Sequence, residues 1–153
     1  LNPVALLEPT EAGPEINHDS SPSGYRLQVE DTRHPKDARF LTVLQGADAG
    51  QTADAATEVA TTGLAFDGAF VRRKAGGNLL VLFRRDIESP LSSKWTATCE
   101  LPDALAAGNG YVADLTPGAT YYLSRVPHQL TISSESTSGA SAIRADAGGL
   151  LRM

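Results

Sequence analysis

Side chains capable of catalysis or of zinc binding are few in this chain and lie far apart in the sequence. His18, His34 and His128 fall into no zinc-ligand spacing. The chain has no Gly-x-Ser-x-Gly element that would present a serine nucleophile. Glycoside hydrolysis needs two carboxylates facing each other across a cleft, which a sequence alone does not reveal. We therefore expect no catalytic residue, no cofactor and no protein-ligated transition metal in this chain.

Calcium is the remaining metal to consider, because aspartates occur along much of the chain. None of them lies in the spaced Asp-x-Asp-x-Asp-Gly loop of the EF-hand. A calcium ion held by a loop stays open as an alternative. The aspartates considered are Asp31, Asp37, Asp48, Asp54, Asp67 and Asp86.

The single cysteine, Cys99, has no intramolecular partner, so the chain has no disulfide framework. It alternates with Trp95 and Ala97 along an apolar strand face. A thiol in that position behaves as a small hydrophobic side chain. We expect Cys99 to be buried and unreactive.

The charge balance limits the kinds of partner. Thirteen basic and eighteen acidic residues give a formal net charge of −5, and the pI is near 5.1. A chain of this charge has no basic footprint for nucleic acid or for an anionic membrane surface. The densest basic groups, Arg72–Lys74 and Arg84–Arg85, are predicted to form a solvated strand edge. Capture of an acidic sugar or of a partner's carboxylates is the alternative for them.

The hydrophobic pattern has a period of two, cut into short pieces by Gly, Pro, Asn and Asp, with no helical segment. This pattern predicts an all-β fold, a two-sheet antiparallel β-sandwich of about eleven short strands. Residues 1–24, rich in proline and serine, are expected to be an extended lead-in with an edge strand near 4–7, and residues 25–153 the sandwich domain. The expected strands are Tyr25–Glu30, Arg39–Gln45, Thr57–Phe66, Ala69–Lys74, Asn78–Arg84, Lys94–Glu100, Tyr111–Leu115, Thr120–Arg125, His128–Ser134, Ser141–Arg144 and Leu150–Met153.

A hairpin is expected around Gly76-Gly77, with Val71 opposite Leu82. This register puts Val71, Leu80 and Leu82 on one face and Phe70, Leu79, Val81 and Phe83 on the other, so the second strand is apolar on both sides. Such a strand is normally covered on both faces. Either a loop of the chain covers the outer face, or that face docks another domain or subunit. The candidate docking face is Leu80, Leu82 and Val71.

Strand parity also sorts the aromatic residues. Tyr25, Trp95 and Tyr121 align with apolar neighbours and are expected to be in the core. Tyr122 alternates with Thr120 and Ser124, so it faces outward and is the candidate sugar contact.

Three segments resemble a known family: Tyr25-Arg-Leu-Gln-Val-Glu through Phe-Leu-Thr-Val-Leu-Gln45, the turn Asp114-Leu-Thr-Pro-Gly-Ala-Thr-Tyr-Tyr-Leu123, and the closing Asp146-Ala-Gly-Gly-Leu-Leu-Arg-Met153. Together they are similar to the C-terminal β domain of heparinase II/III-like polysaccharide lyases, over most of 25–153. The resemblance implies a β domain packed on a larger helical toroid that carries most of the catalytic residues. No catalytic tyrosine or histidine of that family maps onto a residue of this chain. The Leu-x-Pro-Gly-x-x-Tyr turn is shared with fibronectin-type modules.

The expected function is that of a noncatalytic accessory domain of a larger, secreted, bacterial polysaccharide-degrading protein. Its partner would be a neighbouring domain of the same polypeptide or a separate chain, and its wider ligand a polysaccharide. Because the chain begins with Leu1, we expect a processed or excised fragment. A carbohydrate-binding module and an interaction or adhesion domain of a surface assembly are the alternatives.

Overall fold

The structure is a computed structural model that describes the backbone of residues 4–9 and 25–30, and residues 41–43, 45, 50–74, 76–106 and 109–153. The chain divides into two compact units, Leu1–Phe40 and Leu41–Met153. In the first unit β1 (Val4–Pro9) pairs antiparallel with β2 (Tyr25–Glu30). The strand expected at 25–30 is therefore present as β2, in the first unit.

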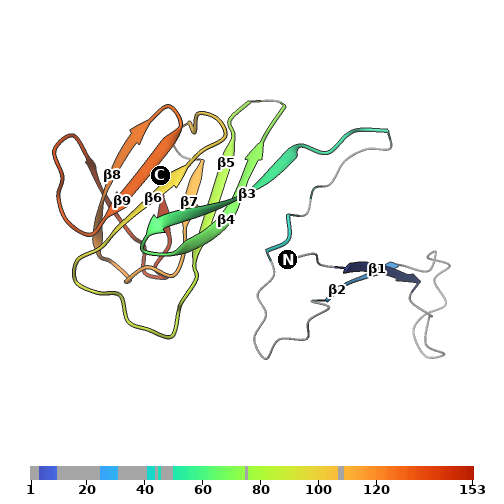
Figure 1. Ribbon diagram of the computed structural model, residues 1–153, viewed down its shortest axis with the longest axis horizontal. Coiled ribbons are helices and arrows are strands. Elements are labelled where there is room, and N and C mark those ends of the chain that lie inside the picture. The colour runs from blue at the N-terminus through green and yellow to red at the C-terminus, as the bar shows by residue number, and fades with distance from the viewer. Residues whose placement is uncertain are drawn as a thin grey trace. The chain divides into compact units, whose positions relative to one another are not determined.

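The second unit is all-β in its described residues, as expected (Figure 1). It contains no helix long and apolar enough to cross a membrane, within the residues described. Its strands are β3 (Ala55–Gly63), β4 (Phe66–Arg72), β5 (Leu79–Arg84), β6 (Thr96–Glu100), β7 (Gly110–Val112), β8 (Thr120–Val126), β9 (Gln129–Ser133), β10 (Ser141–Arg144) and β11 (Leu151–Arg152).

These nine strands form one continuous sheet in the order β10-β8-β9-β6-β3-β4-β5-β7-β11. Strand β3 connects its two halves, because Ala55–Ala60 pair with β4 and Thr61–Gly63 pair with β6. Figure 1 shows β3 passing from the side of β4 to the side of β6. The edge strands β10 and β11 approach each other through the turn at 146–150, where the Asp146 N–H donates to the Leu150 carbonyl oxygen at 2.9 Å. The sheet is therefore nearly closed.

One hydrophobic core fills the unit and draws on both halves of the sheet. Phe66, Phe70, Leu80 and Leu82 come from β4 and β5, and the other half supplies Ala97, Cys99, Leu123, Leu130 and Ile132. Tyr121 is buried, as parity predicted. Trp95 is only half-buried and packs between Phe66 and Tyr121, with ring centroids 6.0 and 5.4 Å away. The side chain of Tyr25 lies outside the described residues.

The turn between β3 and β4 lies three residues earlier than the expected strand end at Phe66. Gly63 adopts a φ of 80°, a conformation that favours glycine. The Thr61 hydroxyl secures the turn by donating to the Leu64 carbonyl oxygen at 2.6 Å and accepting from the Phe66 N–H at 2.8 Å. The expected strand over 39–45 is absent from its described residues, 41–43 and 45.

The β4–β5 hairpin has a different register from the predicted one. Val71 pairs with Leu79, not with Leu82. The N–H of Gly76 donates to the carbonyl oxygen of Arg73 at 3.1 Å, so the chain reverses before the glycine pair and not between its two members. Gly76 and Gly77 then follow the turn with φ values of 83° and 73°.

This three-residue displacement changes which side chains share a face, because an odd shift of register exchanges the two faces of a strand. Leu80 and Leu82 lie on the inward face beside Phe70, and both have no exposed surface. Val71 lies on the outward face with Leu79 and Val81.

Cys99 is buried in the core with 1% of its surface exposed. Burial, followed by the charge of Glu100, raises the pKa of its thiol from 9.0 to about 11. The thiolate, which is the reactive form, is therefore scarce at neutral pH.

We expect Cys99 to resist a thiol-specific disulfide reagent in the folded protein and to react at once after denaturation. The folded state holds the thiol proton to about pH 11, whereas the unfolded chain releases it near 9.0. The neutral thiol of Cys99 therefore contributes fully to the free energy of unfolding below pH 9. This contribution, about 2–3 kcal/mol, is lost as the pH rises toward 11. Chemical denaturation at several alkaline pH values measures it, and Cys99→Ala should remove this component. Rapid labelling of the native protein would contradict the assignment.

Candidate functional site

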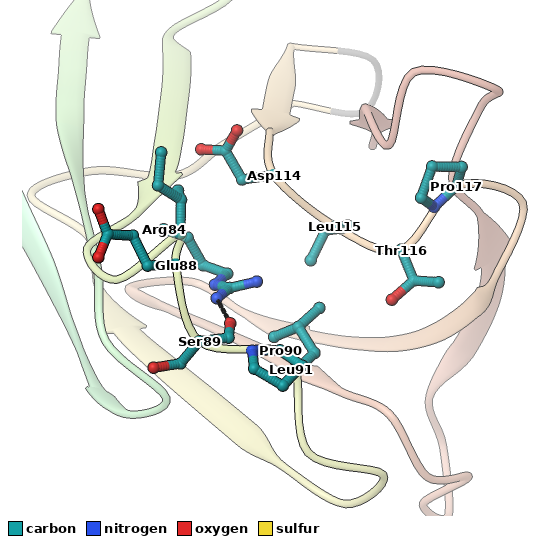
Figure 2. A pocket seen from close by; sticks show the side chains of 10 residues that line it. Arg84, Glu88, Ser89, Pro90, Leu91, Asp114, Leu115, Thr116 and Pro117 are labelled. Carbon is teal, nitrogen blue, oxygen red and sulfur yellow. Dashed lines mark hydrogen bonds between the residues drawn. The ribbon is translucent and has the colours of Figure 1, made fainter.

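An open pocket lies at the end of the sheet where β5 and β7 finish (Figure 2). These two strands form the one parallel pair among the described strands, with Val81 beside Tyr111. Their carboxyl ends therefore lie at the same edge, which brings the segments that follow them together. The pocket has a volume of about 380 Å³ and is lined by Arg84, Ile87, Glu88, Ser89, Pro90, Leu91, Asp114, Leu115, Thr116 and Pro117.

Arg84 is a buried charged group in the lining of this pocket. Like Leu80 and Leu82, Arg84 lies on the inward face of β5, and only 9% of its surface is exposed. Its Nη2 donates to the Ser89 carbonyl oxygen, which ties the segment after β5 back onto the sheet. A guanidinium presents several N–H donors in one plane and matches carboxylate oxygens.

The segment that carries Ser89 is ordered by Asp86. The Asp86 Oδ1 accepts hydrogen bonds from the backbone N–H groups of Glu88 and Ser89, each at 3.1 Å. Hydrogen bonding from Ser89 is the main cause that lowers the pKa of Asp86, with smaller contributions from Glu88 and from the charge of Arg84. Asp86 is thus an ionised turn residue that fixes one wall of the pocket.

The opposite wall is the segment from Asp114 to Pro117. Asp114 has a φ of 62° and is the one residue other than glycine with a positive φ among those described. Such a conformation in a non-glycine residue marks a position that the surroundings impose. The Leu115 N–H donates to the Gly149 carbonyl oxygen at 3.1 Å, and the Thr116 N–H donates to the Tyr121 hydroxyl oxygen at 3.0 Å. Asp114 is the first residue of the Asp114–Leu123 turn but was not among the predicted site residues.

The hydroxyl of Tyr121 holds this wall, so we expect Tyr121→Phe to lower the free energy of unfolding by about 1–2 kcal/mol, because the Thr116 N–H loses its acceptor. Tyr122→Phe is the matched control, since Tyr122 lies next in the sequence and faces outward. Its loss should be smaller. Thermal unfolding followed by circular dichroism compares the two variants, and equal losses would contradict the role given to Tyr121.

The pocket lining carries the charged side chains of Arg84, Glu88 and Asp114 and the hydroxyl groups of Ser89 and Thr116. Figure 2 shows the carboxylate of Asp114 pointing away from the guanidinium of Arg84. Pro90, Leu91, Leu115 and Pro117 give it aliphatic walls. Among the described residues, no group of three or more His, Cys, Asp or Glu side chains is arranged to hold a metal ion.

The predicted site residues lie apart from this pocket. Leu80 and Leu82 are in the core with no exposed surface, so the outward side of β5 carries a different set of residues from the expected docking face. Val71 does lie on the outward side, 7% exposed. Tyr122 is half-buried on the outward side of β8.

The basic groups serve different purposes. Arg72 forms an ion pair with Asp103 at 3.4 Å, and Arg85 is held by the carboxylate of Asp67, which raises the pKa of Arg85 by hydrogen bonding and charge. Both pairs are exposed and stabilise little. Arg84 alone of these three turns inward. The signal for it was present in the sequence, two residues beyond Leu82 in an alternating strand.

No protein-family model, curated protein or solved structure matches this chain. In its described residues the second unit is all-β, and the resemblance to the β domain of heparinase II/III-like lyases remains a prediction.

Proposed function

We propose that this chain is a noncatalytic β-sandwich accessory domain of a larger, secreted polysaccharide-degrading protein, in which it docks and braces a neighbouring domain. The observation that carries the proposal is the outward side of β4, β5 and β7. There, Val71, Leu79, Val81, Phe83 and Tyr111 point to the same side and form an apolar face, which the Asp67–Arg85 ion pair borders beside Phe83.

The exposure of this apolar face supports docking. Phe83 is 40% exposed, Leu79, Val81 and Tyr111 are half-buried, and Val71 is buried. Arg152 lies over the Tyr111 ring, with its Cζ 5.9 Å from the ring centroid. Aromatic and arginine side chains are enriched at protein interfaces, and contiguous apolar patches commonly mark them.

The two-layer arrangement is part of the same proposal. The two halves of the sheet that join at β3 would face each other as the layers of a sandwich. The shared core, to which both halves contribute buried side chains, supports this reading.

The test uses the chain alone at increasing concentration. An uncovered apolar face should cause self-association in analytical ultracentrifugation and should bind a hydrophobic dye, and Phe83→Asp should abolish both. Val126→Asp is the matched control, because Val126 is 56% exposed at the end of β8, on the other half of the sheet. It should leave both signals unchanged.

A strictly monomeric wild-type chain that binds no dye would overturn the docking role. The assignment to a polysaccharide-degrading protein is tested separately by the reading frame that encodes the chain. A helical toroid domain encoded in that frame would support it, and its absence would count against it.

A further inference from the structure

The outward side of β6, β9 and β8 differs from the apolar face on the other half of the sheet. Cross-strand pairing places Thr96 opposite Ser133 and Ser133 opposite Tyr122 in one row, and Thr98 opposite Thr131 and Thr131 opposite Ser124 in the next. Every position of this grid carries a hydroxyl group. We call it the hydroxyl face, formed by Thr96, Thr98, Tyr122, Ser124, Thr131 and Ser133.

The alternate residues of these strands show that the grid faces outward. Ala97, Cys99, Leu123, Leu130 and Ile132 are all buried in the core. On the hydroxyl face Thr96 is exposed, Thr98, Tyr122, Ser124 and Thr131 are half-buried, and Ser133 is buried with 3% of its surface exposed.

Hydroxyl–hydroxyl contacts within the hydroxyl face are long. Ser133 is engaged elsewhere, because its Oγ donates to the Trp95 carbonyl oxygen at 3.3 Å and accepts from the Glu135 N–H at 3.0 Å. The Thr98 and Thr131 hydroxyl oxygens lie 3.4 Å apart, as do those of Thr96 and Ser133. Each hydroxyl can donate one hydrogen bond and accept two. Neighbouring strands of a sheet lie about 4.8 Å apart, so the grid spans about 10 Å across its three strands.

The six positions of the hydroxyl face carry no charge, and the Lys94–Glu135 ion pair, at 2.7 Å, borders them two residues before Thr96 and two residues after Ser133. At the outward parity of β6, β8 and β9, the one charged residue is Glu100 at the end of β6, and its carboxylate accepts a hydrogen bond from Gln129 at 2.7 Å. Charged residues make up 20% of the chain. Opposite charges commonly pair across the solvent face of a sheet, so an uncharged grid needs a different explanation.

The chemistry of the hydroxyl face favours one kind of occupant. Protein interfaces are depleted in serine and enriched in large aromatic and apolar side chains, which this face lacks apart from Tyr122. A nucleic acid or an acidic polymer would need lysine or arginine at the grid. A neutral polysaccharide needs neither, because its hydroxyl groups donate and accept in the same way as the grid does, and an aromatic ring gives its apolar sugar face a surface to pack on.

We infer that the hydroxyl face binds a neutral polysaccharide chain that lies across β6, β9 and β8, with Tyr122 packing against a sugar ring. The site is separate from the apolar face and from the pocket at Arg84. It supplies Tyr122, the candidate sugar contact, with polar neighbours from two other strands.

Affinity gel electrophoresis of the whole chain tests the inference. The probes are dextran, hydroxyethylcellulose and a soluble galactomannan, with alginate as the acidic polymer. Wild-type protein should be retarded by at least one neutral probe and not by alginate. Thr98→Val with Thr131→Val should weaken that binding about tenfold or more, and so should Tyr122→Ala. Valine suits an exposed strand, so the double variant keeps its fold.

Thr57→Val is the matched control, because it removes an exposed hydroxyl from β3, outside the grid, and it should bind as the wild type does. Retardation by alginate alone, or by none of the neutral probes, would overturn the inference. Unchanged binding by both the double valine variant and Tyr122→Ala would overturn it as well. None of these outcomes depends on Phe83, so a failed docking experiment and a failed polysaccharide experiment are distinguishable.

Discussion

Leu82→Asp is expected to abolish the folded state of the 41–153 unit, whereas Phe83→Asp should leave it folded. Leu82 has no exposed surface and lies in the core. An aspartate there would either be ionised without a partner or take up a proton, and a change of this kind costs about 4 kcal/mol or more. That is a large part of the 5–15 kcal/mol typical of a domain.

Phe83 is the matched control because it is adjacent in β5, of opposite parity and 40% exposed. Circular dichroism, thermal unfolding and an amide correlation spectrum distinguish the two variants. A folded Leu82→Asp protein beside an unfolded Phe83→Asp protein would show that the register of β4 and β5 is wrong. The same comparison separates the core from the apolar face proposed for docking.

Gly68→Ala is expected to be the second severe substitution, with a loss of about 3 kcal/mol, at the upper end of the usual cost of overpacking. A methyl group at Gly68 would overlap the carbonyl oxygen of Val81 and lie 2.9 Å from the Cδ2 of Leu82. Gly68 pairs with Leu82 in the middle of the sheet, so the obstruction includes backbone that cannot rotate away.

Gly148→Ala is the matched control, since the nearest atom to its methyl group would be the Asp146 Oδ1 at 3.4 Å, an ordinary contact. Its free energy of unfolding should stay within about 1 kcal/mol of the wild type. Urea denaturation of both variants provides the measurement. Equal stability of the two would mean that β4 and β5 lie further apart at this point.

The apolar face proposed for docking and the hydroxyl face proposed for polysaccharide binding lie on opposite halves of one sheet. Phe83 and Tyr111 belong to the half formed by β4, β5 and β7, and Tyr122 belongs to the half formed by β6, β9 and β8. An accessory domain of this design would hold a neighbouring domain with one half and a polysaccharide chain with the other. Because the two surfaces share no residue, each can be removed by substitution while the other is kept.

The sequence alone determined the local elements of this protein. Alternation within 94–100, 120–125 and 128–134 predicted the strands that became β6, β8 and β9, and it assigned Cys99 and Tyr121 to the core. Such predictions succeed because successive side chains of a strand point to opposite sides, a property of the covalent chain itself. Once one face is apolar, burial follows.

The tertiary structure decided which strands became neighbours and in which register. The hairpin shifted by three residues because the reversal begins at Arg73, before the glycine pair, and this moved Leu80 and Leu82 from the expected docking face into the core. The parallel pairing of β5 with β7 created the pocket at Arg84, and the registers of β6, β8 and β9 created the hydroxyl face. These outcomes depend on hydrogen bonds between segments far apart in the chain, and an alternating pattern specifies the face of a side chain without specifying its neighbour on the next strand.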